Sequence, residues 1–240
     1  MLTCTSTTSG PVAVLAFAGR LDLDGVASVR TALHKALADQ PAAIVVDLAD
    51  VDVDNDVTLT VFSAFASFAG RWSGCPVVMS VPDQRPRALL HRLGITRTVS
   101  VHPNLPAAIA AARAMPVPPS VRYAVVAAAD APAIARRRVV DACRAWQLPH
   151  LVDDAELIVT ELVANVVRHV GGIMDLRLTL RERYLQLAIR DGSTQRPMRR
   201  LPDPDTGEGG RGLVLVEAVA ASWGCAEAID GKVVWATLRR

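Results

Sequence analysis

Two side chains suited to phosphate chemistry, Glu161 and Asn165, lie four residues apart within the segment 151–170. Apolar residues recur there at helical spacing, which predicts a helix. Residues four apart share a helix face, so a carboxylate and an amide oxygen reach the same space. Asn165 is then a candidate ligand for a magnesium ion that keeps waters and substrate phosphates, and Glu161 is a candidate general base. His169 lies one turn further on. A solvated polar stripe is the alternative, and the commoner one for this pair alone.

A second pair, Asp191 and Gly192, ends the segment 184–190, whose alternating apolar residues predict a strand. A carboxylate at a strand end can accept a hydrogen bond from an adenine amino group, and a glycine beside it lets the backbone approach the base. An ordinary turn is the alternative for this pair taken alone.

The third motif is a glycine-rich loop that contains Arg211 and is followed by an apolar segment, 213–221, which predicts a helix. A glycine loop before a helix N-terminus offers free N–H groups to phosphate, and the arginine adds positive charge. A flexible linker is the alternative. Three motifs in this order predict an ATP site, with ATP and magnesium as cofactors. Beside Glu161 as base and Asn165 as magnesium ligand, the candidate nucleotide-binding residues are Asp191, Gly192, Gly207, Gly209, Gly210, Arg211, Gly212 and Leu213.

Composition excludes several classes of protein. The chain has 240 residues, of which 51% are hydrophobic, enough for two modest domains. A net charge of +2, with interspersed signs, predicts neither nucleic acid nor an anionic membrane as a partner. Only two basic side chains are lysines, Lys35 and Lys232, which we interpret as codon bias. The four cysteines form no metal or disulfide pattern, and no run reaches the length of a membrane span. We expect a soluble, cytoplasmic protein with free thiols.

Three prolines within residues 115–120 mark a domain boundary. We expect a domain over 1–115, a linker over 116–120 and a second domain over 121–240. In the first domain, strands and helices alternate, which predicts an α/β fold with helices packed on a sheet. The expected strands are 12–17, 43–48, 76–81 and 98–101, and the expected helices are 25–38, 58–69, 87–93 and 105–114.

From about residue 120 to 240, these motifs resemble the ATPase domain shared by histidine kinases, gyrase and the bacterial anti-sigma-factor serine kinases, in the short actinobacterial form of the last group. The resemblance implies a two-layer α/β sandwich. It also implies that Glu161 is the general base, Asn165 the magnesium ligand, Asp191 the adenine-binding aspartate and 210–213 the second glycine box. The family pattern Asp-x-Gly-x-Gly is reduced here to Asp-Gly-Ser-Thr-Gln over 191–195, so the first box is degenerate and we expect weak ATP affinity.

Residues 10–114 resemble the STAS domain, the fold of anti-sigma-factor antagonists, through the segments 19–22, 44–48 and 87–95. In that family a serine in the loop after the Val-Asp-Leu strand is phosphorylated by the partner kinase. The matching stretch here, 55–59, lacks that serine. Three hypotheses remain open: nearby aspartates imitate a phosphate, which would add about −1.5 to −2 charges; Thr58 or Thr60 is a shifted acceptor; or the loop only docks a partner. The aspartates are Asp52, Asp54 and Asp56.

The two resemblances together imply a partner-switching regulator of transcription, with a sigma factor, an antagonist protein or both as partners. In one hypothesis it is an ATP-dependent serine/threonine kinase acting on a separate antagonist. In the alternative it is a non-catalytic, nucleotide-binding module that sequesters a sigma factor or another regulator. A sensor whose first domain binds a small ligand is a third class. The oligomeric state stays open, with a homodimer among the assemblies considered.

Overall fold

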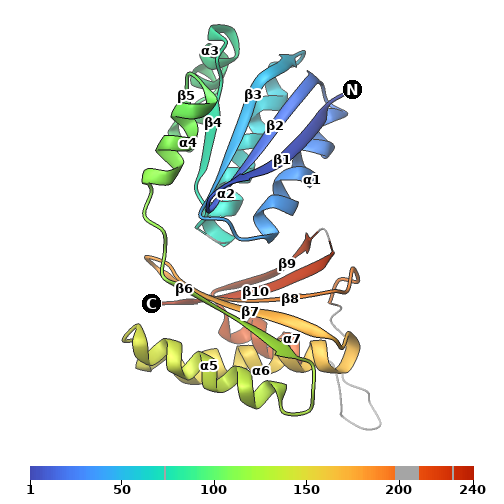
Figure 1. The fold of residues 1–240 in the computed structure, drawn as a ribbon, viewed down its shortest axis with the longest axis vertical. Helices are drawn as coiled ribbons and strands as arrows, with labels where there is room; N and C mark the ends of the chain where they lie inside the picture. The colour runs from blue at the N-terminus through green and yellow to red at the C-terminus, as the bar shows by residue number, and fades with distance from the viewer. Residues whose placement is uncertain (73, 198–210, 229) are drawn as a thin grey trace. The chain divides into compact units, whose positions relative to one another are not determined.

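The chain folds into two compact units, Met1–Val117 and Pro118–Arg240, in a computed structural model that describes residues 1–72, 74–197, 211–228 and 230–240 (Figure 1). Their boundary falls inside the proline-rich stretch. Strand β6 begins at Ser120, so regular structure starts at the last residue expected to be linker.

The first unit is a five-stranded sheet in the order β1-β2-β3-β4-β5. The first strand runs antiparallel to the second, and the others run parallel. Helices and 3-10 turns connect the parallel strands, as the alternating pattern predicts. The strands are β1 (Thr3–Ser9), β2 (Val12–Leu21), β3 (Ala43–Val53), β4 (Val77–Ser80) and β5 (Ser100–His102). The connecting elements are α1 (Gly25–Ala38), η1 (Asp56–Leu59), α2 (Thr60–Trp72), α3 (Gln84–Arg92), η2 (Ile95–Arg97) and α4 (Leu105–Ala114).

The central strand β3 shows why this sheet could be predicted from the sequence. Its first four residues are all buried, as expected of a parallel strand covered on both faces. On one face, Val45 and Val78 pack against Ala108 and Ala112 of α4. Strand β1 was not expected, because its residues are almost all polar and exposed at the sheet edge.

The second unit is an antiparallel sheet in the order β6-β7-β8-β10-β9, with its helices on one face (Figure 1). This is the two-layer α/β sandwich expected for the second domain. Its core lies between sheet and helices and includes Ile158 and Leu162 opposite Leu187 and Ile189. The strands are β6 (Ser120–Val126), β7 (Ile173–Leu180), β8 (Tyr184–Asp191), β9 (Ser222–Ala228) and β10 (Gly231–Arg239). The helical elements are α5 (Ala131–Ala145), η3 (Pro149–Leu151), α6 (Val152–His169) and α7 (Arg211–Val219).

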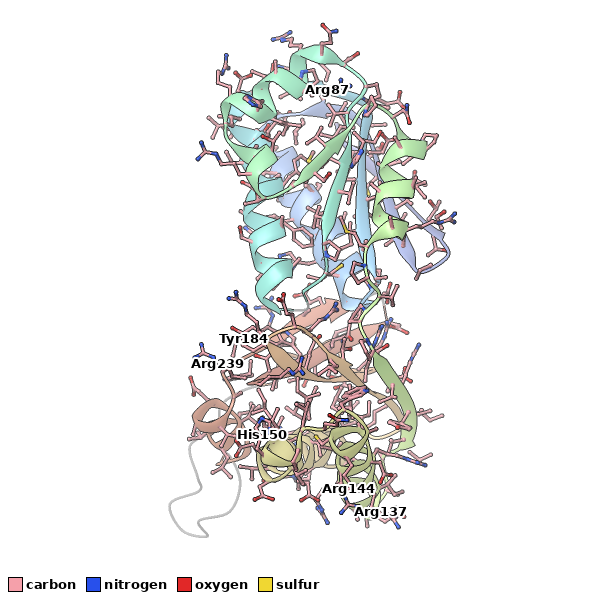
Figure 2. The ribbon with its side chains drawn as sticks, turned by 90° about the vertical axis from the view of Figure 1, so that its left-hand side faces the viewer. Arg87, Arg137, Arg144, His150, Tyr184 and Arg239 are labelled. Atoms are coloured by element: carbon pink, nitrogen blue, oxygen red, sulfur yellow. The ribbon has the colours of Figure 1, made fainter. Side chains whose placement is uncertain are left out.

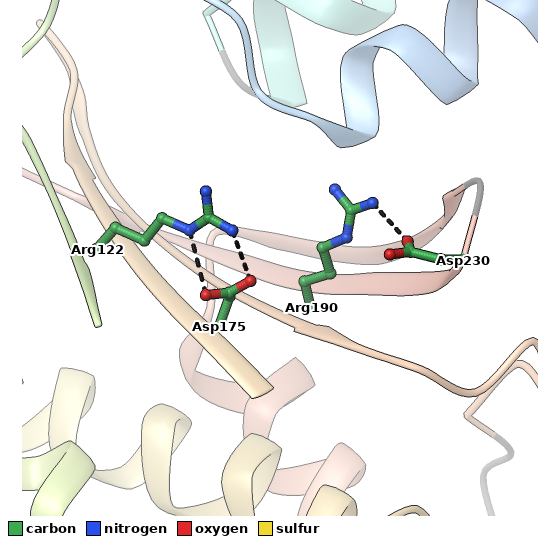
Figure 3. Close-up of polar contacts among 4 residues, drawn as sticks. All are labelled: Arg122, Asp175, Arg190 and Asp230. Carbon is green, nitrogen blue, oxygen red and sulfur yellow. Dashed lines mark hydrogen bonds and ion pairs between the residues drawn. The ribbon is translucent and has the colours of Figure 1, made fainter. Parts of the chain in front are cut away.

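Ion pairs cross the face of this sheet that carries no helices (Figure 3). Arg122 donates two hydrogen bonds to Asp175, at 3.2 and 2.6 Å, and Arg190 donates one to Asp230 at 2.5 Å. The hydrogen bond and positive charge of Arg190 lower the pKa of Asp230 below its ordinary value. One partner of each pair is well exposed, Arg122 at 64% and Asp230 at 71%, so each pair contributes little to folding stability.

The three consecutive arginines of α5 do not form one uniform solvated face. Arg136 donates to Thr160 Oγ1 at 3.3 Å, and the Arg138 guanidinium lies 4.9 Å from the centre of the Tyr123 ring. Arg137, by contrast, is exposed and extends outward, as does Arg144 on the same helix (Figure 2). Among the described residues, no helix is long and apolar enough to cross a membrane.

Candidate functional site

Helix α6 supplies one wall of a cavity of about 490 Å³ in the second unit. The buried face of the helix, with Ile158, Leu162 and Val166, holds it against the sheet. This packing brings the side of the helix that carries Asn165 to the end of β8, the start of α7 and strand β10. The cavity is lined by Leu162, Asn165, Val166, Arg168, His169, Val170, Ile189, Asp191, Ser193, Gln195, Arg196, Pro197, Gly212, Leu213, Lys232 and Val234.

One residue or more from each of the three sequence motifs lines this single cavity. Asn165 comes from α6, Asp191 from the end of β8, and Gly212 and Leu213 from the start of α7. His169, one turn beyond Asn165, lines it as well. Residues up to 48 positions apart in the chain therefore converge on one site.

Glu161 lies against the N-terminal turn of α7. A Cβ atom placed on Gly212 would collide with the Glu161 carboxylate, so a larger residue at this position would force that carboxylate to move. The carboxylate is also 4.0 Å from the Arg168 guanidinium, and its side chain is 21% exposed. Glu161 is thus adjacent to the cavity through Gly212 and remains accessible to solvent.

The other predicted residues are placed as follows. Gly192 directly follows β8, where a Cβ atom would have room, and it is not among the lining residues. Arg211 is the first residue of α7, but its side chain lies outside the part that the structure describes. Gly207, Gly209 and Gly210 also lie outside the described residues.

Asp191 forms a buried ion pair with Lys232, its direct neighbour across β8 and β10. Lys232 Nζ donates to Asp191 Oδ1 at 2.7 Å, and the two side chains are only 7% and 1% exposed. The Ser193 backbone N–H donates to the same oxygen at 2.8 Å, and Lys232 Nζ is 3.4 Å from the Ser193 carbonyl oxygen. The predicted base-binding carboxylate is therefore held by a cation and a backbone amide.

Lys232 is a candidate site residue that the sequence interpretation missed, because codon bias does not predict a lysine in a buried ion pair. A usable signal was present: Lys232 is the sole lysine of the second unit, in a chain whose other cations are almost all arginine. Its side chain points to the helix side of β10, as does that of Val234, and both line the cavity.

The degenerate glycine box forms a compact turn beside this ion pair. In addition to the bond from Ser193 N–H to Asp191, the Gln195 N–H donates to Ser193 Oγ at 3.2 Å. Both Ser193 and Gln195 line the cavity. Arg196, which follows, lines it too and pairs with Glu227 at 3.1 Å.

The lining suits a nucleotide. Leu162, Val166, Ile189 and Val234 offer apolar surface to a planar base, and the basic side chains Arg168, His169 and Arg196 favour an anion. Within the described residues, no group of three His, Cys, Asp or Glu side chains could hold a metal ion. The Asn165 amide fits a magnesium ion that takes most of its ligands from phosphate and water.

In the first unit, the loop after β3 is ordered by local bonds. Asn55 Oδ1 accepts from the Val57 N–H at 3.1 Å, and the Thr58 hydroxyl donates to the Asn55 carbonyl at 2.6 Å. Ion pairs join Asp54 to Arg20 at 2.5 Å and Asp56 to Arg92 at 2.7 Å. Two of the three aspartates are therefore paired with arginine.

Comparisons with known proteins gave one family match and several similar solved structures. Residues 125–238 match the family model described as "Histidine kinase-like ATPase domain". The first unit is similar to a crystal structure of an anti-sigma factor antagonist from Mycobacterium paratuberculosis, with 27% identity and a TM-score of 0.41, over 47% of this chain and 95% of that one. It is also similar to the antagonist SpoIIAA in its unphosphorylated form, with 13% identity and a TM-score of 0.39, over 48% and 99%. A search of curated proteins gave no match.

Residues 125–238 of the second unit are thus similar to the histidine kinase-like ATPase domain that the motifs indicated. The chain joins this domain to an α/β unit that is similar to anti-sigma factor antagonists.

Proposed function

We propose that the second unit binds ATP with magnesium in the cavity beside α6, and that the whole chain is a cytoplasmic partner-switching regulator of transcription. The observation that carries the proposal is the convergence of Asn165, Asp191 and Gly212 on one cavity within an ATPase-family domain. Magnesium would be held by the Asn165 amide oxygen and would supply charge stabilisation to the phosphates. Asp191 would accept from the base, and the N-terminal turn of α7 would face the phosphates.

The reaction that this arrangement supports is phosphoryl transfer to a serine or threonine of a separate antagonist protein. The hydroxyl oxygen of the partner forms a bond to the γ-phosphorus while the bond to the β,γ-bridging oxygen breaks, leaving ADP. Glu161, accessible beside Gly212, accepts the hydroxyl proton. Such chemistry is mainly positioning and charge stabilisation, so few protein groups are needed.

A second function is favoured by a specific observation. Asp191 already has a cationic partner in Lys232, and the first glycine box is degenerate. Both features weaken the case for fast turnover. They favour a module in which bound nucleotide stabilises a surface that sequesters a sigma factor or another regulator.

Incubation of the full chain with magnesium and labelled ATP, alone and with candidate antagonist proteins, separates these functions. Transfer of label to a partner selects the kinase. Saturable binding without transfer selects the sequestering module. No binding of ATP under either condition would contradict both.

We further predict that the first unit is not phosphorylated by the second. Thr58 is only 2% exposed and its hydroxyl is bonded to Asn55, so it cannot reach a phosphoryl donor without unfolding of η1. Thr60 is exposed but donates to the Val57 carbonyl at 2.7 Å. Because Asp54 and Asp56 are paired with arginines, the loop carries less free negative charge than a phosphate, which favours docking over phosphate imitation.

Intact-mass and peptide mass spectrometry after incubation with ATP and magnesium test this expectation. We expect an unchanged mass for the first unit. Stoichiometric phosphate on Thr58 or Thr60 would show instead that the protein switches itself.

A further inference from the structure

In the cavity, the ammonium of Lys232 lies beside the predicted base-binding carboxylate of Asp191. This pair bears on which nucleotide bases the cavity can bind. Lys232 and Asp191 both line the cavity, both are more than nine-tenths buried, and their charged atoms are 2.7 Å apart. A carboxylate alone favours adenine, which presents an amino group, and disfavours a 6-oxopurine, whose carbonyl oxygen would face like charge. The Lys232 ammonium beside this carboxylate can donate to the carbonyl oxygen of a 6-oxopurine, which removes the preference for adenine.

Among the residues that the structure describes, the hydrogen-bonding capacity of the pair is not used up. An ammonium has three N–H donors, and those of Lys232 have two partners here, Asp191 Oδ1 and the Ser193 carbonyl oxygen. Both bonds to the Asp191 carboxylate, from Lys232 and from the Ser193 N–H, end on Oδ1, so Oδ2 takes part in neither. With respect to the described part of the chain, one donor and one acceptor therefore remain for a ligand at the same end of the cavity.

We propose that Lys232 and Asp191 together bind the six-membered ring of a purine, so that the cavity takes 6-oxopurine nucleotides as well as ATP. This inference rests on the proposed nucleotide site and adds its base specificity. With adenine, Asp191 accepts from the amino group and Lys232 donates to N1. With hypoxanthine or guanine, Lys232 donates to O6 and Asp191 accepts from N1–H. The flexible four-carbon stem of lysine lets its ammonium serve either order of donor and acceptor.

Titration calorimetry of the full chain with ATP, GTP and inosine triphosphate, each with magnesium, tests the inference. Inosine triphosphate isolates the O6 and N1–H edge, because hypoxanthine lacks the 2-amino group. We expect dissociation constants for GTP and inosine triphosphate within about tenfold of that for ATP. A preference for ATP greater than tenfold would overturn the inference while leaving the proposed ATP site intact. Failure of all three to bind would refute the site itself, and the base specificity with it.

The variant Lys232→Met removes the donor and keeps a side chain of similar length. In this variant we expect GTP and inosine triphosphate to lose at least about tenfold more affinity than ATP, since a charge-assisted hydrogen bond to a carbonyl oxygen is lost. Lys35→Met, which changes the other lysine of the chain, is the matched control and should leave all three affinities unchanged. Equal losses for the three nucleotides would show that Lys232 only holds Asp191. If Lys232→Met does not fold, the nucleotide preference of the unchanged protein decides the question.

Discussion

Lys232→Met is expected to lower the free energy of unfolding of the second unit by about 3–5 kcal/mol, since it leaves a buried carboxylate without its cation. Asp191 would keep only the Ser193 N–H as a partner among the contacts described above. Asp191→Leu should cost a similar amount by stranding the ammonium. The measurement is urea unfolding of the full chain, followed by the fluorescence of its tryptophans and by circular dichroism.

The double variant Asp191→Leu, Lys232→Met distinguishes a true ion pair from general crowding. Replacing both charges by apolar groups is often neutral or stabilising, so we expect the double variant to recover most of the lost stability. The interaction free energy from this double-mutant cycle should exceed about 2 kcal/mol. Single variants within about 0.5 kcal/mol of the parent, with additive effects, would contradict a buried ion pair at this position.

Glu161→Ala is expected to reduce phosphoryl transfer to an antagonist by about 10²- to 10⁴-fold, the contribution typical of a general base, while ATP affinity stays nearly unchanged. The carboxylate abuts Gly212 and is not itself a lining group of the cavity, so its removal spares the base-binding end. Transfer rates and nucleotide titrations on the same preparations provide the two readouts.

Asp154→Ala is the matched control, because Asp154 is an exposed carboxylate on the same helix and lies outside the cavity. It should leave both transfer and binding unchanged. Transfer that persists at the parent rate in Glu161→Ala would show that another group accepts the proton.

The sequence predicted best the elements whose residues are buried in a regular pattern. Helices 25–38 and 105–114 have the predicted bounds in α1 and α4. The predicted strand 43–48 is longer in the structure, because β3 continues to Val53 with alternating exposed residues beyond its apolar start. Strand β1 has no apolar face at all and depends on backbone pairing with β2, which single-strand periodicity does not reveal.

For the site, the spacing along one helix indicated that Glu161 and Asn165 share a face. It did not indicate that, of these two residues, only Asn165 lines the cavity. That difference arises from the close approach of α7 at Gly212, a tertiary contact. The partner of Asp191 could not be predicted either, because Lys232 is 41 residues away and is brought next to Asp191 only by the register of β8 against β10. Cross-strand register of this kind follows from the assembled sheet.

Magnesium-dependent binding of ATP to the full chain, measured by calorimetry for the parent and for Asn165→Ala, tests the central claim most directly. We predict saturable binding of one ATP per chain that weakens when magnesium is removed. In Asn165→Ala we predict at least about tenfold weaker binding with magnesium, and little change without it, because the amide is proposed to act through the metal. Absence of saturable binding by the parent, or equal affinity of parent and variant with magnesium, would contradict the placement of the nucleotide site beside α6.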